Sequence, residues 1–150
     1  MPTPERMRDA ELKYFASFAT ADVEAIVGLF AEDAVVEDSI GGARMEGAAT
    51  LRAFFGGGFE YVGGGYSFAP EGSVRVAGNH AACAAIATCD KADPPFRLDT
   101  LDVMTFNEAG KIIVMKAYWG PTNMQSLSSD ASDGATAAGR AMDFLKTLGT

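Results

Sequence analysis

The chain has few of the residues that build metal sites and disulfide frameworks: two cysteines and one histidine among 150 residues. Cys83 and Cys89 stand six residues apart in an apolar segment, which matches neither a CxxC motif nor a disulfide framework. We therefore expect two buried thiols in a reducing cytosol. His80 belongs to a predicted turn at residues 78–80, and a single histidine without paired ligands suggests no zinc site. The sequence predicts no metal and no cofactor.

Basic residues and long apolar runs are also scarce. The chain has 12 Lys and Arg against 20 Asp and Glu, and its formal net charge is -8, which disfavours binding to nucleic acid or to an anionic membrane. No apolar run approaches the ~20 residues of a membrane-spanning helix. Residues 1–6 are polar and lack the apolar core of a signal peptide, so we expect a cytoplasmic protein.

Hydrophobic periodicity predicts helices early in the chain and strands later. We expect helices at residues 4–19, at 23–30 after the capping Asp22, and at 48–55, where the glycines at 56–58 would end the third helix. We expect strands at 66–70, 73–77, 81–89, 98–106 and 111–119, the last two joined as a hairpin. This order predicts an α+β fold in which three N-terminal helices pack on a curved, mixed or antiparallel sheet and enclose an apolar cavity in a cone-shaped roll.

The end of the chain has a different composition. Residues 126–139 are rich in Ser, Ala, Asp and Gly, which predicts a linker, and residues 140–148 fit one short amphipathic helix. We therefore divide the chain into a domain at residues 1–125 and a tail at residues 126–150.

Asp38 stands at the far end of a short apolar strand, just before the Gly41-Gly42 turn. A carboxylate there can lean into a pocket and serve as a base for a proton on carbon. Its ordinary alternative is to cap the turn. Tyr14 lies on the apolar face of the first helix, where its hydroxyl needs a partner, and a core tyrosine bonded to a carbonyl is the ordinary alternative there.

Asp102 falls on the inward face of the predicted strand at 98–106, and Asp99 falls on the opposite face. If Phe106 pairs with Lys111, Met115 lies across from Asp102. The residues that then share the face of Asp102 are Ile113, Ala117 and Trp119. This apolar neighbourhood would raise the pKa of Asp102 and keep it protonated as a hydrogen-bond donor. A slip of one residue would bring Lys116 opposite Asp102 and keep it ionised.

Two other patterns carry no chemistry. The glycine triplets at 56–58 and 63–65 lack the lysine and helix of a phosphate-binding loop, so we interpret them as turns, with Phe59 and Tyr61 near the cavity mouth. The acidic residues Glu32, Asp33 and Glu37 have no second acidic cluster to face, which favours a solvated surface over a metal site.

Taken together, these residues resemble the ketosteroid isomerases that act on Δ5-3-ketosteroids, within the NTF2-like (SnoaL-like) superfamily of cone-shaped folds, over about residues 3–125. The stretches that carry the resemblance are Tyr14 in the first helix, residues 22–27 leading to 36–41, residues 101–112, and residues 115–119. The resemblance implies a cofactor-free steroid Δ-isomerase. In it, Asp38 is the general base, and Tyr14 and Asp102 hydrogen-bond the oxygen of the dienolate intermediate.

The resemblance also implies an apolar ketone substrate and a homodimer formed through the outer face of the sheet. The residues expected to contact the substrate are Phe18, Phe30, Phe55, Phe59, Thr100, Met115 and Trp119. Phe55 and Phe30 stand where some family members carry tyrosines, so Tyr14 would act with Asp102 alone in a more apolar pocket. Ser39 stands where a proline is common.

Two alternatives remain open. One is another enzyme of this fold, such as a polyketide cyclase; an epoxide hydrolase of this fold would need an Asp-Arg-Asp network, and Arg97 and Asp99 fall on the wrong face for it. The other is a non-catalytic module that binds a lipophile or a partner protein.

Overall fold

The computed structural model describes residues 1–128 and 134–148, without the side chains of 134–138. Its helices are α1 (Pro4–Ala16), α2 (Val23–Val27), α3 (Ala48–Tyr61), the 3-10 turn η1 (Pro121–Asn123) and α4 (Gly134–Leu148). Its strands are β1 (Phe30–Asp38), β2 (Ala43–Glu46), β3 (Ser67–Pro70), β4 (Arg75–Ala77), β5 (His80–Cys89), β6 (Phe96–Phe106), β7 (Ile112–Tyr118) and β8 (Met124–Ser126).

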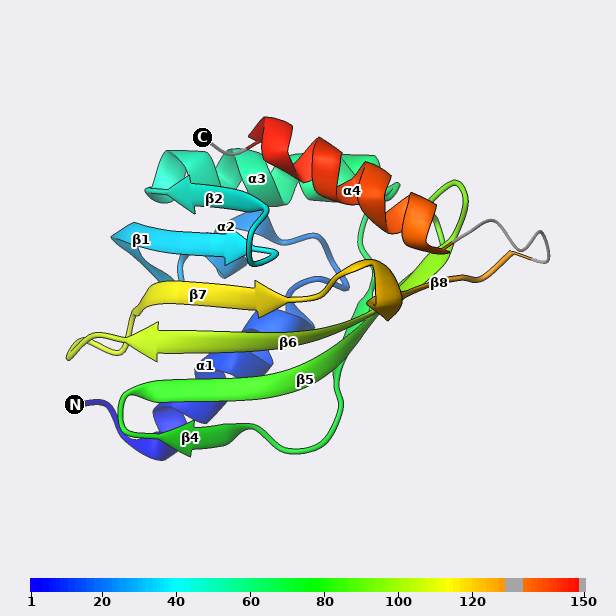
Figure 1. Cartoon of the computed structure of the whole chain (residues 1–150). Coiled ribbons are helices and arrows are strands. Elements are labelled where there is room, and N and C mark those ends of the chain that lie inside the picture. The colour runs from blue at the N-terminus through cyan, green and yellow to red at the C-terminus, as the bar shows by residue number, and fades with distance from the viewer. Residues whose placement is uncertain (129–133, 149–150) are drawn as a thin grey trace.

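The strands form one curved, mixed sheet in the order β2-β1-β7-β6-β5-β3, with β4 paired to β5 and β8 paired to β6. Neighbouring strands are antiparallel except β1 and β7, which are parallel. In the view of Figure 1, α1 and α2 lie behind the sheet, while α3 and α4 run side by side along the edge that carries β2. The predicted α+β cone, with its helices packed against a mixed sheet, is confirmed.

The first two helices are capped by side chains at their N-termini, and Asp22 is the cap predicted for the second. Thr3 Oγ1 accepts a hydrogen bond from the backbone N–H of Arg6 at 3.2 Å, and Asp22 Oδ1 accepts one from Ala25 at 3.0 Å. The prediction that the second helix continues to Phe30 is wrong. This helix ends at Val27, and Phe30 starts β1 because it pairs with Ile112 of β7.

The prediction that the glycines at 56–58 end the third helix is also wrong, because α3 continues through them to Tyr61. A glycine in a helix costs about 0.5–1 kcal/mol relative to alanine. Burial of Phe59, on the same side as Leu51 and Phe55, offsets this cost. Gly57 also makes room for α4: a Cβ there would lie 2.9 Å from Leu148 Cδ1.

Two short strands are absent from the sequence prediction. Strand β2 pairs with the end of β1 across the turn that contains Gly41 and Gly42, and β8 pairs with the start of β6. At the end of the chain, α4 is longer than the helix predicted at 140–148. Part of the predicted linker, residues 129–133, lies outside the described residues. None of the helices in the described ranges is long and apolar enough to cross a membrane.

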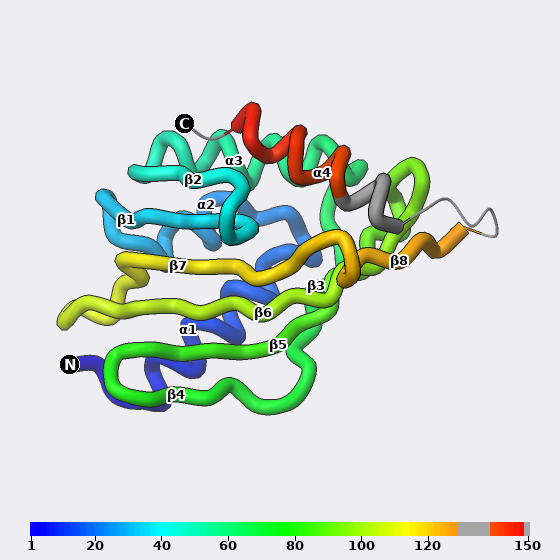
Figure 2. The backbone as a smooth tube through the Cα atoms, viewed as in Figure 1, coloured from blue at the N-terminus to red at the C-terminus, as the bar shows by residue number. Residues whose placement is uncertain are grey.

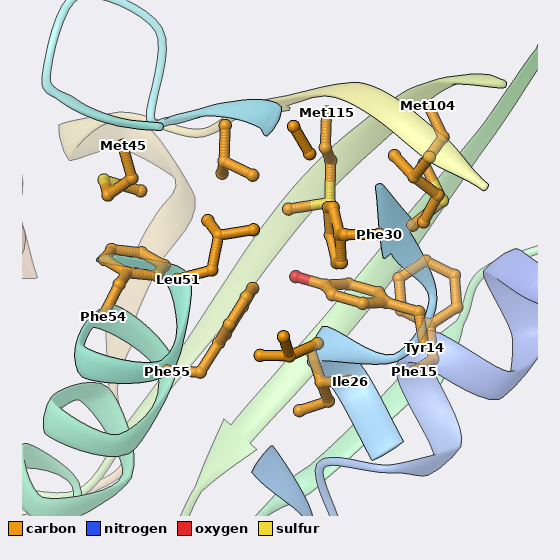
Figure 3. Close-up of a cluster of buried hydrophobic side chains, with 14 of the residues drawn as sticks. Tyr14, Phe15, Ile26, Phe30, Met45, Leu51, Phe54, Phe55, Met104 and Met115 are labelled. Carbon is orange, nitrogen blue, oxygen red and sulfur yellow. The ribbon is translucent and has the colours of Figure 1, made fainter. Parts of the chain in front are cut away.

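The core consists of two clusters of buried side chains. The larger one gathers around Tyr14, Phe15, Phe55 and Met104, where the rings pack mostly edge to face (Figure 3). The smaller one contains Phe96, Trp119 and Ala141. The tube in Figure 2 shows the long strands β5 and β6 running from α1 toward β8 and α4.

Candidate active site

The strand register places two carboxylates on either side of one small residue. Ala117 of β7 pairs with Asp38 of β1 on one side and with Asp102 of β6 on the other. Residues in such a row point to the same face of the sheet. Two strand spacings separate the Cα atoms of Asp38 and Asp102 by roughly 9–10 Å. The methyl group of Ala117 leaves the space between the two carboxyl groups open.

The pairing predicted for the β6–β7 hairpin is wrong by two residues. Asp102 lies opposite Ala117, and Met115 lies opposite Met104. Phe106 pairs with Ile112 and not with Lys111, which shifts the pairing by one residue, and a bulge between Thr105 and Phe106 shifts it by one more. The bulge turns Ile112 inward in place of the predicted Ile113. An even shift keeps the same face. Asp102 therefore still lies on the buried side, with Ala117 and away from Lys116.

Asp38 and Asp102 line one cavity, which holds about 110 Å³. Most of the site residues predicted from the sequence lie on its wall: Tyr14, Phe18, Asp38, Phe55, Phe59, Thr100, Asp102 and Trp119. Phe30 and Met115 are not among its lining residues. Both are buried in the larger core cluster instead, beside Tyr14 (Figure 3). The wall is mainly apolar, and none of the described residues that line the cavity is a lysine or an arginine.

Asp38 is partly buried at the end of β1, where Ile40 N–H donates to the carbonyl of Ala117 and continues the pairing with β7. Its Oδ1 accepts a hydrogen bond of 2.7 Å from the indole N–H of Trp119. Burial raises the pKa of Asp38 to about 6, although the Trp119 hydrogen bond lowers it. The carboxyl group is therefore mostly ionised at neutral pH and can accept a proton.

Asp102 is 2% exposed, and Thr100 donates a hydrogen bond of 3.1 Å to its Oδ1. Burial, followed by the charge of Asp38, raises the pKa of Asp102 to about 8, against the opposing effect of Thr100. Asp102 is therefore mostly protonated at neutral pH and can donate a hydrogen bond. The two carboxyl groups of the row thus carry different protonation states.

Tyr14 is fully enclosed on α1, and its hydroxyl points away from the helix into the space beside Phe55 (Figure 3). Among the described residues no hydrogen bond is formed by this hydroxyl, which leaves it available to a ligand. Burial, the charge of Asp102 and that of Asp38 raise the pKa of Tyr14 well above its usual value. The hydroxyl therefore remains a donor at any ordinary pH.

Sequence reasoning missed several residues of the site. Tyr66 lines the cavity, and its ring packs on that of Phe18. Its backbone N–H donates a hydrogen bond to the backbone carbonyl of Phe18. Gly65 permits this approach: a Cβ there would lie 2.4 Å from the carbonyl oxygen of Ala19. The glycine triplet was the available signal, but a turn does not reveal which residue it presents. Ala141 and Leu145 of α4 also line the cavity.

Glu11 is a further residue to which the sequence assigned no role. It lies one turn before Tyr14, is fully buried, and neither of its carboxyl oxygens has a hydrogen-bond partner among the described residues. Burial, then the charge of Asp102, raises its pKa to about 9. Its position on the apolar stripe of the first helix was the signal in the sequence, because a charged residue is expected on the opposite face.

Asp99 lies on the outer face of β6, where Arg97 Nε contacts its Oδ1 at 2.9 Å. Neither residue lines the cavity, so this ion pair cannot activate a water molecule inside it. Within the described part of the chain, no group of three or more His, Cys, Asp and Glu side chains is placed to hold a metal ion.

Comparison with known proteins gives the family of this chain. Residues 12–115 match the model of the SnoaL-like domain, and the chain belongs to this family of NTF2-like cone folds. The chain is 31% identical over 118 residues to a steroid Delta-isomerase of Nocardioides simplex, which covers 79% of this chain and 93% of that protein. It also resembles the solved structure of SalBIII, an epoxide hydrolase/cyclase-like enzyme of pyran ring formation in salinomycin. That match has 26% identity, covers 84% of this chain and 99% of the other, and has a TM-score of 0.74.

Proposed function

We propose that this protein is a cofactor-independent isomerase that moves the double bond of a β,γ-unsaturated ketone into conjugation, on a steroid-like substrate. The observation that carries the proposal is the row formed by Asp38, Ala117 and Asp102 on one apolar cavity. The likeness to a steroid Delta-isomerase supports the same reaction.

In the proposed reaction the substrate lies over Ala117 with its ketone oxygen between Tyr14 and Asp102. The ionised Asp38 removes a proton from the carbon between the ketone and the double bond, and the electrons move onto the oxygen to give a dienolate. Tyr14 and protonated Asp102 donate hydrogen bonds to that oxygen, where negative charge develops. Asp38 then returns the proton two carbons along, so the atoms balance and nothing is oxidised or reduced.

The reaction can be followed directly, because the conjugated enone absorbs in the ultraviolet. With a 5-en-3-oxo steroid, Asp38→Asn should lower turnover by roughly 10²–10⁴ because the base is lost. Tyr14→Phe should lower it by roughly 10²–10³ because one donor to the oxyanion is lost. Asp99→Asn is the matched control on the outer face of the sheet. Near-normal turnover in both cavity variants, or no enone from the wild-type chain at high concentration, would remove the proposal.

A second candidate is a cyclase or epoxide-opening enzyme, which the likeness to SalBIII favours. Such an enzyme also needs an acidic residue at the cavity, and Asp38 could serve it. The absence of lysine and arginine from the described cavity wall favours the isomerase, since an Asp-Arg-Asp network would place an arginine there. Ring closure of a hydroxy-epoxide probe by the wild-type chain, without enone formation from the steroid, would select the second candidate. Binding of both compounds without turnover would select a lipophile-binding module.

We further propose a homodimer. Leu101 and Tyr118 are directly paired on the outer face of the sheet and are 41% and 44% exposed, which gives that face an apolar patch for a second copy. Sedimentation of the chain would test this assembly. The two free, buried thiols Cys83 and Cys89 support the expectation of a reducing compartment such as the cytoplasm.

A further inference from the structure

Helix α4 forms part of the cavity wall, although it lies beyond residue 115, where the family match ends. Ala141 and Leu145 both line the cavity. They are four residues apart and therefore lie on the same face of the helix. Ala141 is buried in the smaller core cluster, while Leu145 packs against both clusters. The helix is thus a structural part of the site.

Contacts with α3 hold α4 in this place. The rings of Tyr61 and Phe144 stack with centroids 4.4 Å apart at an angle of 15°. Next to them, Leu148 occupies the space left by the missing side chain of Gly57. Figure 1 shows the two helices side by side above β2.

The cavity runs from the carboxyl groups toward this helix. Inward-facing residues of β6 line it in sequence from Asp102 through Thr100 and Leu98 to Phe96. At about 3.3 Å per residue, the Cα atoms at the two ends of this line are roughly 20 Å apart. Phe96 lies at the β8 end of the strand, where α4 packs. A ligand whose oxygen lies between Tyr14 and Asp102 therefore extends toward Ala141.

Because the cavity is small, the position of its end wall limits the length of the ligand that fits. Its volume of about 110 Å³ is smaller than the roughly 300–1,000 Å³ of a pocket that holds a drug-sized ligand. A compact ring system can fill the acidic end alone. A longer one must press against the far wall, which α4 provides.

We propose that α4 is the end wall of the ligand cavity, and that the side-chain volumes at Ala141 and Leu145 set the length of the ring system that the protein accepts. The class of ligand rests on the proposed function. The role of α4 as a wall is a statement about ligand binding, which can be measured without turnover.

The experiment compares the binding of two saturated ketones that cannot isomerise, one with two fused rings and one a four-ring 3-oxo steroid. Trp119 is the one tryptophan in the chain and lines the cavity, so its fluorescence reports binding. Overpacking the wall in Ala141→Leu should raise the Kd of the four-ring ketone at least about fivefold and leave that of the two-ring ketone nearly unchanged. Leu145→Ala should shift the ratio of the two Kd values in favour of the longer ligand.

Each variant has a matched control on the same helix. Asp143→Leu places the same side chain on the exposed face, and Lys146→Ala creates the same alanine at an exposed residue that does not line the cavity. Both controls should leave the Kd ratio unchanged. The proposal is overturned if Ala141→Leu weakens both ligands equally or neither, if Lys146→Ala shifts the ratio as much as Leu145→Ala, or if the wild-type chain binds neither ketone. If the wild-type chain binds both ketones but makes no enone from the unsaturated steroid, the proposed reaction is wrong. The ratio of the two Kd values then still tests whether α4 limits the length of the ligand.

Discussion

The two carboxyl groups predict a bell-shaped dependence of kcat/KM on pH. In the free protein Asp38 must be ionised to act as the base, and its pKa is about 6, so activity should fall as the pH drops below that value. Asp102 must be protonated to donate, and its pKa is about 8, so activity should fall as the pH rises above it. The optimum should therefore lie near pH 7, midway between the two.

The size of the effect follows from the same two pKa values. At pH 7 each group is one unit from its pKa on the favourable side, so about nine tenths of it is in the active form. At pH 5 only about a tenth of Asp38 is ionised, and at pH 9 only about a tenth of Asp102 is protonated, so activity should be about tenfold lower at either limit. Initial rates of enone formation at low substrate concentration measure this profile.

Three variants assign the limbs of the profile. Asp102→Asn keeps a hydrogen-bond donor that does not ionise, so the fall near pH 8 should disappear. Trp119→Phe removes the hydrogen bond that lowers the pKa of Asp38, so the acid limb should move to higher pH. Asp99→Asn, on the outer face of the same strand, should leave the profile unchanged. A wild-type profile that is flat from pH 5 to 9, or an alkaline limb that survives in Asp102→Asn, would refute the reasoning.

Two further substitutions test other parts of the structure. Glu11→Met should stabilise the protein. In the wild type the carboxyl group of Glu11 ionises in the unfolded chain from pH 4.5 upward, but in the folded protein only near its raised pKa of about 9. The wild type therefore loses stability as the pH rises from 4.5 toward about 9, and the variant does not. Urea unfolding should show the stability difference between Glu11→Met and the wild type growing by about 2–3 kcal/mol from pH 5 to pH 7. A constant difference would mean that Glu11 is ionised in the fold. Ala117→Leu should fill the space between the carboxyl groups and lower turnover by about 10² while the protein stays folded; unchanged kcat and KM would show that the substrate does not lie over this residue.

The sequence was sufficient for the features that depend on local pattern. Alternation along β6 placed Asp102 inward and Asp99 outward, and both are found so. Asp22 predicted the start of α2, which it caps. The buried face of α1 follows from its period and includes Tyr14.

The features that local pattern did not give depend on contacts between distant segments. Gly56 and its neighbours end a helix in isolation, yet α3 continues because Phe59 is buried and α4 packs over Gly57. The hairpin register differs from the predicted one by two residues, one from the pairing of Phe106 with Ile112 and one from the bulge beside Thr105, and no count along the sequence reveals either. The row of Asp38, Ala117 and Asp102 requires the parallel pairing of β1 with β7, two strands separated by residues 39–111. The approach of Ala141 to the cavity is likewise a matter of tertiary packing.

The same row explains how the proposed reaction can keep Asp102 protonated throughout. Before the proton moves, the negative charge is on Asp38, and that charge raises the pKa of Asp102. After Asp38 has taken the proton, the charge is on the dienolate oxygen, which Asp102 itself contacts in the proposed geometry. Asp102 therefore has one negative charge nearby in both states, and in neither does it gain by ionising. A single apolar cavity that holds one negative charge thus lets Asp38 act as the base and Asp102 as the hydrogen-bond donor. A cation in the cavity would favour ionisation of Asp102, and the described wall contains no lysine or arginine.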